Sequence, residues 1–109
     1  MVAFVRGDVV VIPFPFSDLS ATKRRPALVL ATLPGDDVIL CQITSQARTT
    51  PAVMPIVAAD FTRGGLNRDN YVRPERLFCA DARIIAYVAG YLSGAKMQDV
   101  LAVVRQIFS

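Results

Sequence analysis

Two short apolar runs separated by a polar loop constrain this chain more than any other feature. The first covers residues 8–14 and the second covers residues 27–32. Both are rich in β-branched residues and bounded by Gly or Pro, which is typical of β-strands. The loop ends in three cations, Lys23, Arg24 and Arg25, and Pro26 restricts the backbone beside them. The sequence therefore predicts a β-hairpin with a basic mouth, although a solvated basic turn would give the same pattern.

The rest of the chain continues as short strands. They are predicted over residues 38–44, 52–56, 71–73, 76–79 and 86–92. Residues 34–37 predict a turn in which Gly35 can take a positive φ. The two glycines within residues 63–67 predict a flexible connection.

The last segment predicts an amphipathic helix with Ser93 as its N-cap. Six apolar residues fall on one face at helical spacing: Met97, Val100, Leu101, Val104, Ile107 and Phe108. We expect this face to contact the core or a second copy of the chain. Many short strands with one packed helix indicate a mainly β protein with a C-terminal helix, built as a small curled antiparallel barrel.

Composition sets the class of protein. The chain has 109 residues, of which 53% are hydrophobic and 19% are charged, so a single folded domain over residues 1–109 is expected. No apolar run approaches the roughly 18 residues of a membrane span, and no signal peptide is recognisable, so no membrane contact and a cytoplasmic location are expected. Cys41 and Cys79 both lie in apolar runs and are predicted to be buried, without a disulfide.

The net charge is +3, and the placement of the cations matters more than their number. Five arginines lie between residues 63 and 83, in addition to the three cations at residues 23–25. A fold that brings these segments together would present a basic cleft to phosphate groups. Scattered, solvated charges are the other interpretation.

Absent residue types exclude several kinds of chemistry. The chain has no histidine, which excludes the His-based acid–base pairs and catalytic triads. Two separated cysteines cannot form an ordinary zinc site, and no nucleotide-binding glycine motif is present. We therefore expect no metal and no cofactor.

Three motifs in order carry a resemblance to a known family. They are Gly-Asp-Val at residues 7–9, Arg-Pro-Ala-Leu-Val-Leu at residues 25–30 and Ile-Thr-Ser-Gln at residues 43–46. Their order and spacing, with the segment at residues 70–77 and the C-terminal helix, resemble the MazF/PemK family of toxins over nearly the whole chain. The resemblance implies an SH3-like antiparallel β-barrel of the MazF, PemK and CcdB kind, forming a symmetric homodimer.

The resemblance also implies a function. Members of the family are sequence-specific, metal-independent endoribonucleases of type II toxin–antitoxin systems. They cleave single-stranded RNA, including mRNA, to 2′,3′-cyclic phosphate and 5′-hydroxyl ends, and thereby inhibit translation and growth. The implied partners are the RNA substrate, a cognate antitoxin encoded nearby, a second copy of the chain, and operator DNA reached through the antitoxin complex.

Catalytic residues are carried over by motif. Arg25 matches the catalytic arginine of the Arg-Pro motif, and arginine suits a developing phosphorane because its fork matches phosphate oxygens. Thr44 matches the catalytic threonine and would hydrogen-bond a phosphoryl oxygen; a strand-end hydroxyl bonded to backbone is the other interpretation. Glu75 and Arg73 match an acid and an arginine that some members use. Neighbouring arginines favour an ionised Glu75, suited to act as a base, and a surface ion pair remains an alternative.

Seven further residues are predicted to bind RNA, in the loop after the first strand, the basic mouth, and the ends of later strands: Phe16, Ser20, Lys23, Arg24, Ser45, Gln46 and Arg76. In the family, the loop that follows the first strand gates access to the substrate. Phe14 and Phe16 could stack on bases or belong to the core. Two other functions stay open: a catalytically inactive module that binds nucleic acid or antitoxin, and a gyrase-targeting toxin acting through the C-terminal helix.

Overall fold

The computed structural model describes residues 3–15, 22–46, 52–67 and 69–109. Within these ranges the chain forms strands, two short 3-10 helices and one α-helix. The strands are β1 (Asp8–Pro15), β2 (Thr22–Thr32), β3 (Asp37–Thr44), β4 (Met54–Ile56), β5 (Phe61–Gly64), β6 (Asn70–Asp81) and β7 (Tyr87–Leu92). The helices are η1 (Ala58–Asp60), η2 (Ala82–Ile84) and α1 (Gly94–Ile107).

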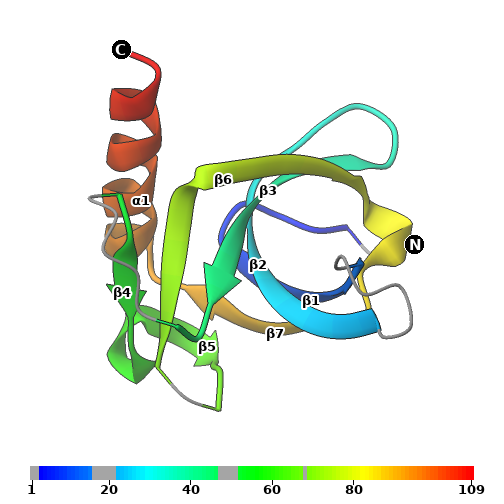
Figure 1. The fold of residues 1–109 in the computed structure, drawn as a ribbon, viewed down its shortest axis with the longest axis horizontal. Coiled ribbons are helices and arrows are strands. Elements are labelled where there is room, and N and C mark those ends of the chain that lie inside the picture. The colour runs from blue at the N-terminus through cyan, green and yellow to red at the C-terminus, as the bar shows by residue number, and fades with distance from the viewer. Residues whose placement is uncertain (1–2, 16–21, 47–51, 68) are drawn as a thin grey trace.

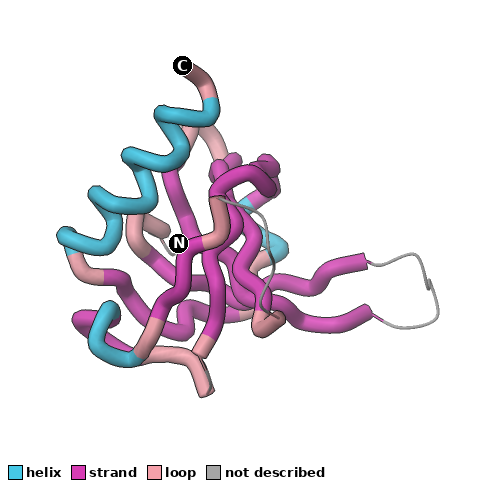
Figure 2. The backbone as a smooth tube through the Cα atoms, turned by 60° about the vertical axis from the view of Figure 1, so that its left-hand side comes forward, coloured by secondary structure: helices cyan, strands magenta, loops and turns pink. Residues whose placement is uncertain are grey.

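The described strands form one antiparallel sheet in the order β4-β6-β3-β2-β1-β7-β5. The sheet curls into a half-barrel, with β6 arching over β1 and β2 and with α1 standing along one side (Figure 1). The hairpin of β1 and β2 extends away from α1 (Figure 2). The mainly β architecture with a C-terminal helix, as predicted from the sequence, is confirmed.

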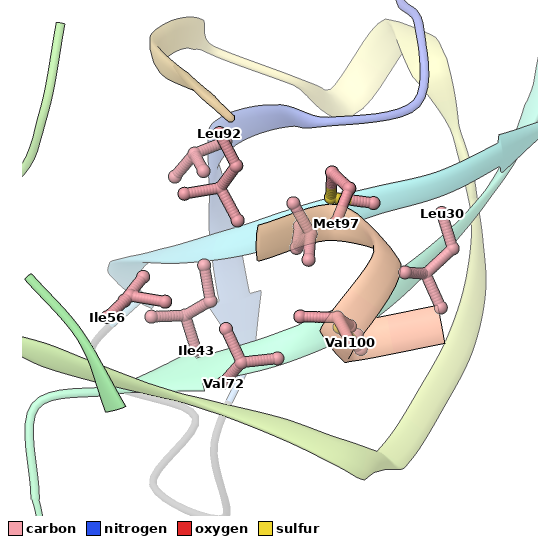
Figure 3. Close-up of a cluster of buried hydrophobic side chains, with 10 residues drawn as sticks. Leu30, Ile43, Ile56, Val72, Leu92, Met97 and Val100 are labelled. Atoms are coloured by element: carbon pink, nitrogen blue, oxygen red, sulfur yellow. The ribbon is translucent and has the colours of Figure 1, made fainter. Parts of the chain in front are cut away.

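Apolar side chains cover both faces of the central strands. Because successive side chains of a strand point to opposite faces, Val9 and Val10 of β1 belong to two different clusters. One cluster contains Val9, Leu28 and Ile43 together with Met97 and Val100 of α1. Figure 3 shows Ile43, Met97 and Val100 within it. We call the side that carries it the helix face. The other cluster contains Val10, Ala27, Val29 and Leu40, and we call its side the opposite face.

Helix α1 begins as its sequence predicts. The Ser93 hydroxyl accepts a hydrogen bond from the backbone N–H of Lys96, 3.2 Å away. Met97 and Val100 are buried, and Leu101 and Val104 pack against the same cluster. The face does not stay buried to its end, because Ile107 is 43% exposed and Phe108 is 74% exposed. No helix within the described residues has the length and apolarity needed to cross a bilayer.

Residues 71–73 and 76–79 were predicted as two strands and form one. On one side of the break, Gln42 of β3 pairs with Arg73 of β6; on the other, Cys41 pairs with Leu77. The pairing of β3 with β2 is unbroken at this point, so the additional residues lie on β6. Pro74, Glu75 and Arg76 therefore form a bulge, and Pro74 is fully buried.

Two other predictions are corrected. Residues 63–67 are not merely a flexible connection, because Arg63 and Gly64 belong to β5. Gly64 has φ +63°, and a Cβ there would lie 2.2 Å from the carbonyl oxygen of Ala89. Cys79 is exposed rather than buried, whereas Cys41 is buried; both are free thiols.

Candidate active site at the ends of β2, β3 and β6

Strand pairing places a group of polar residues on the opposite face. The register pairs Ala27 of β2 with Gln42 of β3, and Gln42 with Arg73 of β6. These three residues form one row across the sheet, beside the apolar row of Val29 and Leu40. Paired residues share a face, so Gln42 and Arg73 project on the same side as the second core cluster.

A second row follows one step nearer the strand ends. Thr44 pairs with Tyr71. The pairing of β2 with β3 ends at Ala27 and Gln42, and Arg25 and Thr44 each lie two residues beyond that pair. Residues two apart in a strand project on the same side. Arg25, Thr44, Tyr71, Gln42 and Arg73 therefore share the opposite face near the place where its core ends.

Arg25 lies within β2 rather than in a loop. The sequence predicted that β2 starts at Ala27, with three cations at the mouth of the hairpin; instead, β2 starts at Thr22 and includes them. Arg25 pairs with Ile12 of β1, whose side chain belongs to the second cluster. Arg25 is half-buried, whereas Arg24 is exposed. Strand alternation thus separates two adjacent arginines, and only Arg25 shares a face with Thr44.

Thr44 is the last residue of β3, and it is 4% exposed. Its Oγ1 atom accepts a hydrogen bond from the backbone N–H of Gln46, 3.2 Å away. This is the backbone contact that the alternative interpretation of Thr44 requires. It uses the hydroxyl as an acceptor, so the hydroxyl proton can still be donated to another oxygen.

Arg73 and Glu75 lie side by side at the start of the bulge in β6. Nη2 of Arg73 lies 3.8 Å from Oε2 of Glu75. This separation makes an ion pair but exceeds hydrogen-bonding distance. Arg73 is 9% exposed, and its Nε atom has no hydrogen-bond partner among the described residues. A buried guanidinium with an unsatisfied N–H is suited to receive an anion, because an incoming oxygen would complete its hydrogen bonding.

Cys41 lies in β3, next to Gln42, and its side chain belongs to the helix-face cluster. Burial raises the pKa of the Cys41 thiol to about 12, and the negative charge of Glu75 contributes to the rise. The thiol therefore stays protonated near neutral pH and is not a nucleophile.

Three other residues predicted to bind RNA lie around this area. Ser45 and Gln46 are exposed and follow β3 directly, and Arg76 is exposed in the bulge. The backbone of Lys23 lies in β2, paired with Phe14. Phe16 and Ser20 lie outside the described residues.

The five arginines between residues 63 and 83 do not form the single cleft that was predicted, as the described ones show. Arg63 is on β5, at the edge of the sheet opposite to the β4–β6 side, where its guanidinium lies 5.4 Å from the ring centroid of Tyr91. Arg83 is exposed, and its Nη2 lies 2.6 Å from Oδ2 of Asp81. Of the described members, only Arg73 and Arg76 lie close together at the bulge of β6, because Arg63 belongs to β5 and Arg83 belongs to η2.

Sequence reasoning missed Gln42 and Tyr71. Both are half-buried, and both pair with predicted site residues. Alternation along β3 could have identified Gln42, because it lies two residues from Thr44 and therefore on the same face. Tyr71 could not be found in this way, since its place beside Thr44 depends on the pairing of β3 with β6.

No cluster of three or more potential metal-ligating side chains occurs among the described residues.

The described elements define a small protein built of one curled antiparallel sheet with a packed C-terminal helix. The family model for the PemK-like, MazF-like toxin of type II toxin–antitoxin systems matches residues 5–108. The chain therefore belongs to the PemK-like, MazF-like toxin family. Comparison with curated protein sequences gave no significant match.

Solved structures share the fold. MazF in a MazE–MazF crystal structure from Deinococcus radiodurans superposes with a TM-score of 0.79 at 19% identity, over 98% of this chain and 97% of that one. An endoribonuclease from a mycobacterial species gives 0.75 at 17% identity, over 99% and 93% of the two chains. A mycobacterial endoribonuclease in complex with its cognate antitoxin gives 0.72 at 16% identity, over 97% and 95%.

Proposed function

We propose that this protein is a sequence-specific, metal-independent endoribonuclease and the toxin of a type II toxin–antitoxin system. The observation that carries the proposal is the register of β2 and β3: Arg25 and Thr44 each lie two residues beyond the pair of Ala27 with Gln42 and share the opposite face. These are the two residues that the motifs single out. The structural similarity to two mycobacterial endoribonucleases supports the same activity.

The reaction needs no external nucleophile. The 2′-hydroxyl of the RNA attacks the adjacent phosphorus, the 5′-oxygen leaves, and the products carry a 2′,3′-cyclic phosphate and a 5′-hydroxyl. The protein must accept one proton, donate one to the leaving oxygen, and stabilise the charge of the phosphorane. Arg25 would stabilise that charge and take part in proton transfer. The hydroxyl of Thr44 would donate to a phosphoryl oxygen.

Arg73 and Glu75 would complete the site. The guanidinium of Arg73 offers a second positive fork on the same face as Thr44. The carboxylate of Glu75, next to it, is a candidate base for the 2′-hydroxyl proton. Arg24, Lys23 and Arg76 would guide the RNA chain through phosphate contacts, which depend on salt but not on sequence.

The partners follow from family membership. The toxin would act in the cytoplasm as a homodimer on single-stranded RNA, including mRNA, and would thereby inhibit translation and growth. A cognate antitoxin encoded nearby would hold it inactive, as the MazE–MazF and toxin–antitoxin complexes among the solved structures suggest. The complex with the antitoxin would in turn reach operator DNA.

A catalytically inactive module is the second candidate. The low exposure of Thr44 and its hydrogen bond with the N–H of Gln46 favour it, since both suit a structural hydroxyl. Such a module would bind RNA or antitoxin through the same arginines without cutting.

End-mapped cleavage of a long RNA in EDTA distinguishes the two. The purified protein is compared with Arg25→Ala and with Arg83→Ala, which removes an exposed arginine far from the site. We expect discrete cuts with 2′,3′-cyclic phosphate and 5′-hydroxyl ends, retained in Arg83→Ala and reduced about 100-fold or more in Arg25→Ala. No cleavage of varied RNAs by the folded, antitoxin-free protein would leave the binding module as the better explanation.

A further inference from the structure

Gln42 and Tyr71 lie next to Thr44, on the face that carries the proposed catalytic residues. Gln42 is in the same strand as Thr44, two residues away, and Tyr71 pairs with Thr44 across β3 and β6. We propose that these two side chains form a base-binding subsite, in which Tyr71 stacks on the base and Gln42 reads its edge. The inference rests on the proposed ribonuclease function and assigns part of its sequence specificity.

The charges around the pair indicate how RNA would lie. Arg25 on β2 and Arg73 on β6 are on either side of β3, and both share a face with Gln42. Two guanidinium groups separated by one intervening strand suit two phosphates of one RNA chain. The nucleoside between those phosphates would then lie over Gln42 and Tyr71.

Gln42 has the chemistry to recognise a base. It is half-buried, at the boundary between the polar area and the apolar row of Val29 and Leu40. Its neighbour on β2 is Ala27, whose single methyl group carries no polar atom that could satisfy the Gln42 amide. A side-chain amide presents one acceptor and one NH₂ donor, which can bond two adjacent groups on a base edge. The amide carries no charge, so its contribution to RNA binding would depend on the base rather than on the phosphate.

Tyr71 has the shape to hold the base. Its ring is half-buried, and its neighbour on β4, Pro55, is exposed. Unstacked RNA bases are commonly held on aromatic side chains, and this contact tolerates any base. Tyr71 would therefore contribute affinity for RNA, and Gln42 would contribute the preference for a particular base.

The test is cleavage of a random-sequence RNA pool with sequencing of the cut sites. It compares the wild type with Gln42→Ala, Tyr71→Ala and Tyr71→Phe. Gln98→Ala and Tyr87→Ala are matched controls, because Gln98 is exposed on α1 and Tyr87 is 52% exposed on β7. Circular dichroism and thermal melting establish that each variant is folded.

We expect Gln42→Ala to lose the base preference at one position of the cleavage sequence while keeping the same end chemistry. Tyr71→Ala should keep the cleavage sequence and raise KM about 10-fold, with Tyr71→Phe close to the wild type. The two control variants should match the wild type in both cleavage sequence and KM. An unchanged cleavage sequence in folded Gln42→Ala, or an unchanged KM in folded Tyr71→Ala, would overturn the assignment.

The subsite can also be tested if the protein proves not to be a ribonuclease. If the wild type cuts no RNA, the same pool is selected for binding, and the enriched sequences are compared between the wild type and the variants. Enrichment that is lost at one position in Gln42→Ala supports the subsite although the catalytic proposal fails. Enrichment that is unaffected by Gln42→Ala, or no RNA binding by the wild type, rejects the subsite.

Discussion

Nη2 of Arg73 lies 3.8 Å from Oε2 of Glu75, at the start of the bulge in β6. Residues two apart in a strand share a face, with Cα atoms about 6.7 Å apart, so two long side chains at such positions can meet. The bulge removes Pro74, Glu75 and Arg76 from the pairing with β3, and bulges are frequent beside active sites. The buried Arg73 is poorly satisfied by the ion pair alone, because its Nε atom has no hydrogen-bond partner among the described residues.

Arg73 and Glu75 should be retained for function rather than for stability. Replacing both members of a buried ion pair by apolar side chains of similar size is often neutral or stabilising, whereas removing one member leaves the other charge unpaired. We expect the double variant Arg73→Leu/Glu75→Leu to leave the free energy of unfolding unchanged or raise it by about 1 kcal/mol, as measured by urea denaturation. RNA cleavage by the same variant should fall about 100-fold in kcat/KM. Arg105→Leu, at an exposed position of α1, is the matched control, and a large loss of stability in the double variant alone would contradict this view.

We expect RNA cleavage to depend on the hydroxyl of Thr44 and not on its methyl group. Thr44→Ser keeps Oγ and should retain most of the activity. Thr44→Val keeps the shape, removes the proposed phosphoryl donor, and leaves the N–H of Gln46 without its acceptor. We expect a loss of about 100-fold in kcat for Thr44→Val and a destabilisation of about 1 kcal/mol. Equal activity of the two variants in single-turnover cleavage would show that Thr44 is only structural.

The two thiols should react very differently. Cys79 is exposed, whereas Cys41 is buried with its pKa raised to about 12. At pH 8 a thiol reagent should label one cysteine per folded chain, identified by mass spectrometry as Cys79, and the second only on unfolding. Labelling of Cys41 at the same rate as Cys79 would be inconsistent with this burial.

Cys41 also predicts a pH dependence of stability. Its pKa is higher in the folded chain than the ordinary value of 9.0, so the unfolded chain releases this proton first as the pH rises. The contribution of Cys41 is therefore complete below pH 9 and is lost between about pH 9 and pH 12. Cys41→Ala should flatten the dependence of the unfolding free energy on pH in that window. An identical slope in the variant and the wild type would count against the raised pKa.

Gly64 and Gly35 should differ in their tolerance of a side chain. Both have positive φ, +63° and +82°, but only Gly64 has a backbone oxygen 2.2 Å from where a Cβ would lie. Gly35→Ala should cost about 1 kcal/mol from backbone strain alone. Gly64→Ala should cost at least about 2 kcal/mol, because β5 must also move away from Ala89 of β7. Chemical denaturation of the two variants measures the difference, and equal losses would show that the close approach is not maintained.

Sequence patterns were sufficient for the local elements. Apolar runs located the cores of β1, β2 and β3, and the spacing from Met97 to Val104 identified the packed face of α1, with Ser93 as its N-cap. These features depend on residues close together in the chain, where alternation, helical periodicity and capping act directly. The order of the motifs also identified the family.

Tertiary structure decided which polar residues meet. Arg25 and Thr44 are 19 positions apart in the sequence, and Tyr71 is 27 positions beyond Thr44, so only strand order and register bring them to one face. The same topology sends Arg63 and Arg83 away from Arg73, although they are near in sequence. The bulge of β6 was also hidden, because it arises from the pairing of β6 with β3, although the sequence itself placed Arg73 near Glu75. Local sequence specifies which face a residue takes within its strand, but the sheet decides its neighbours.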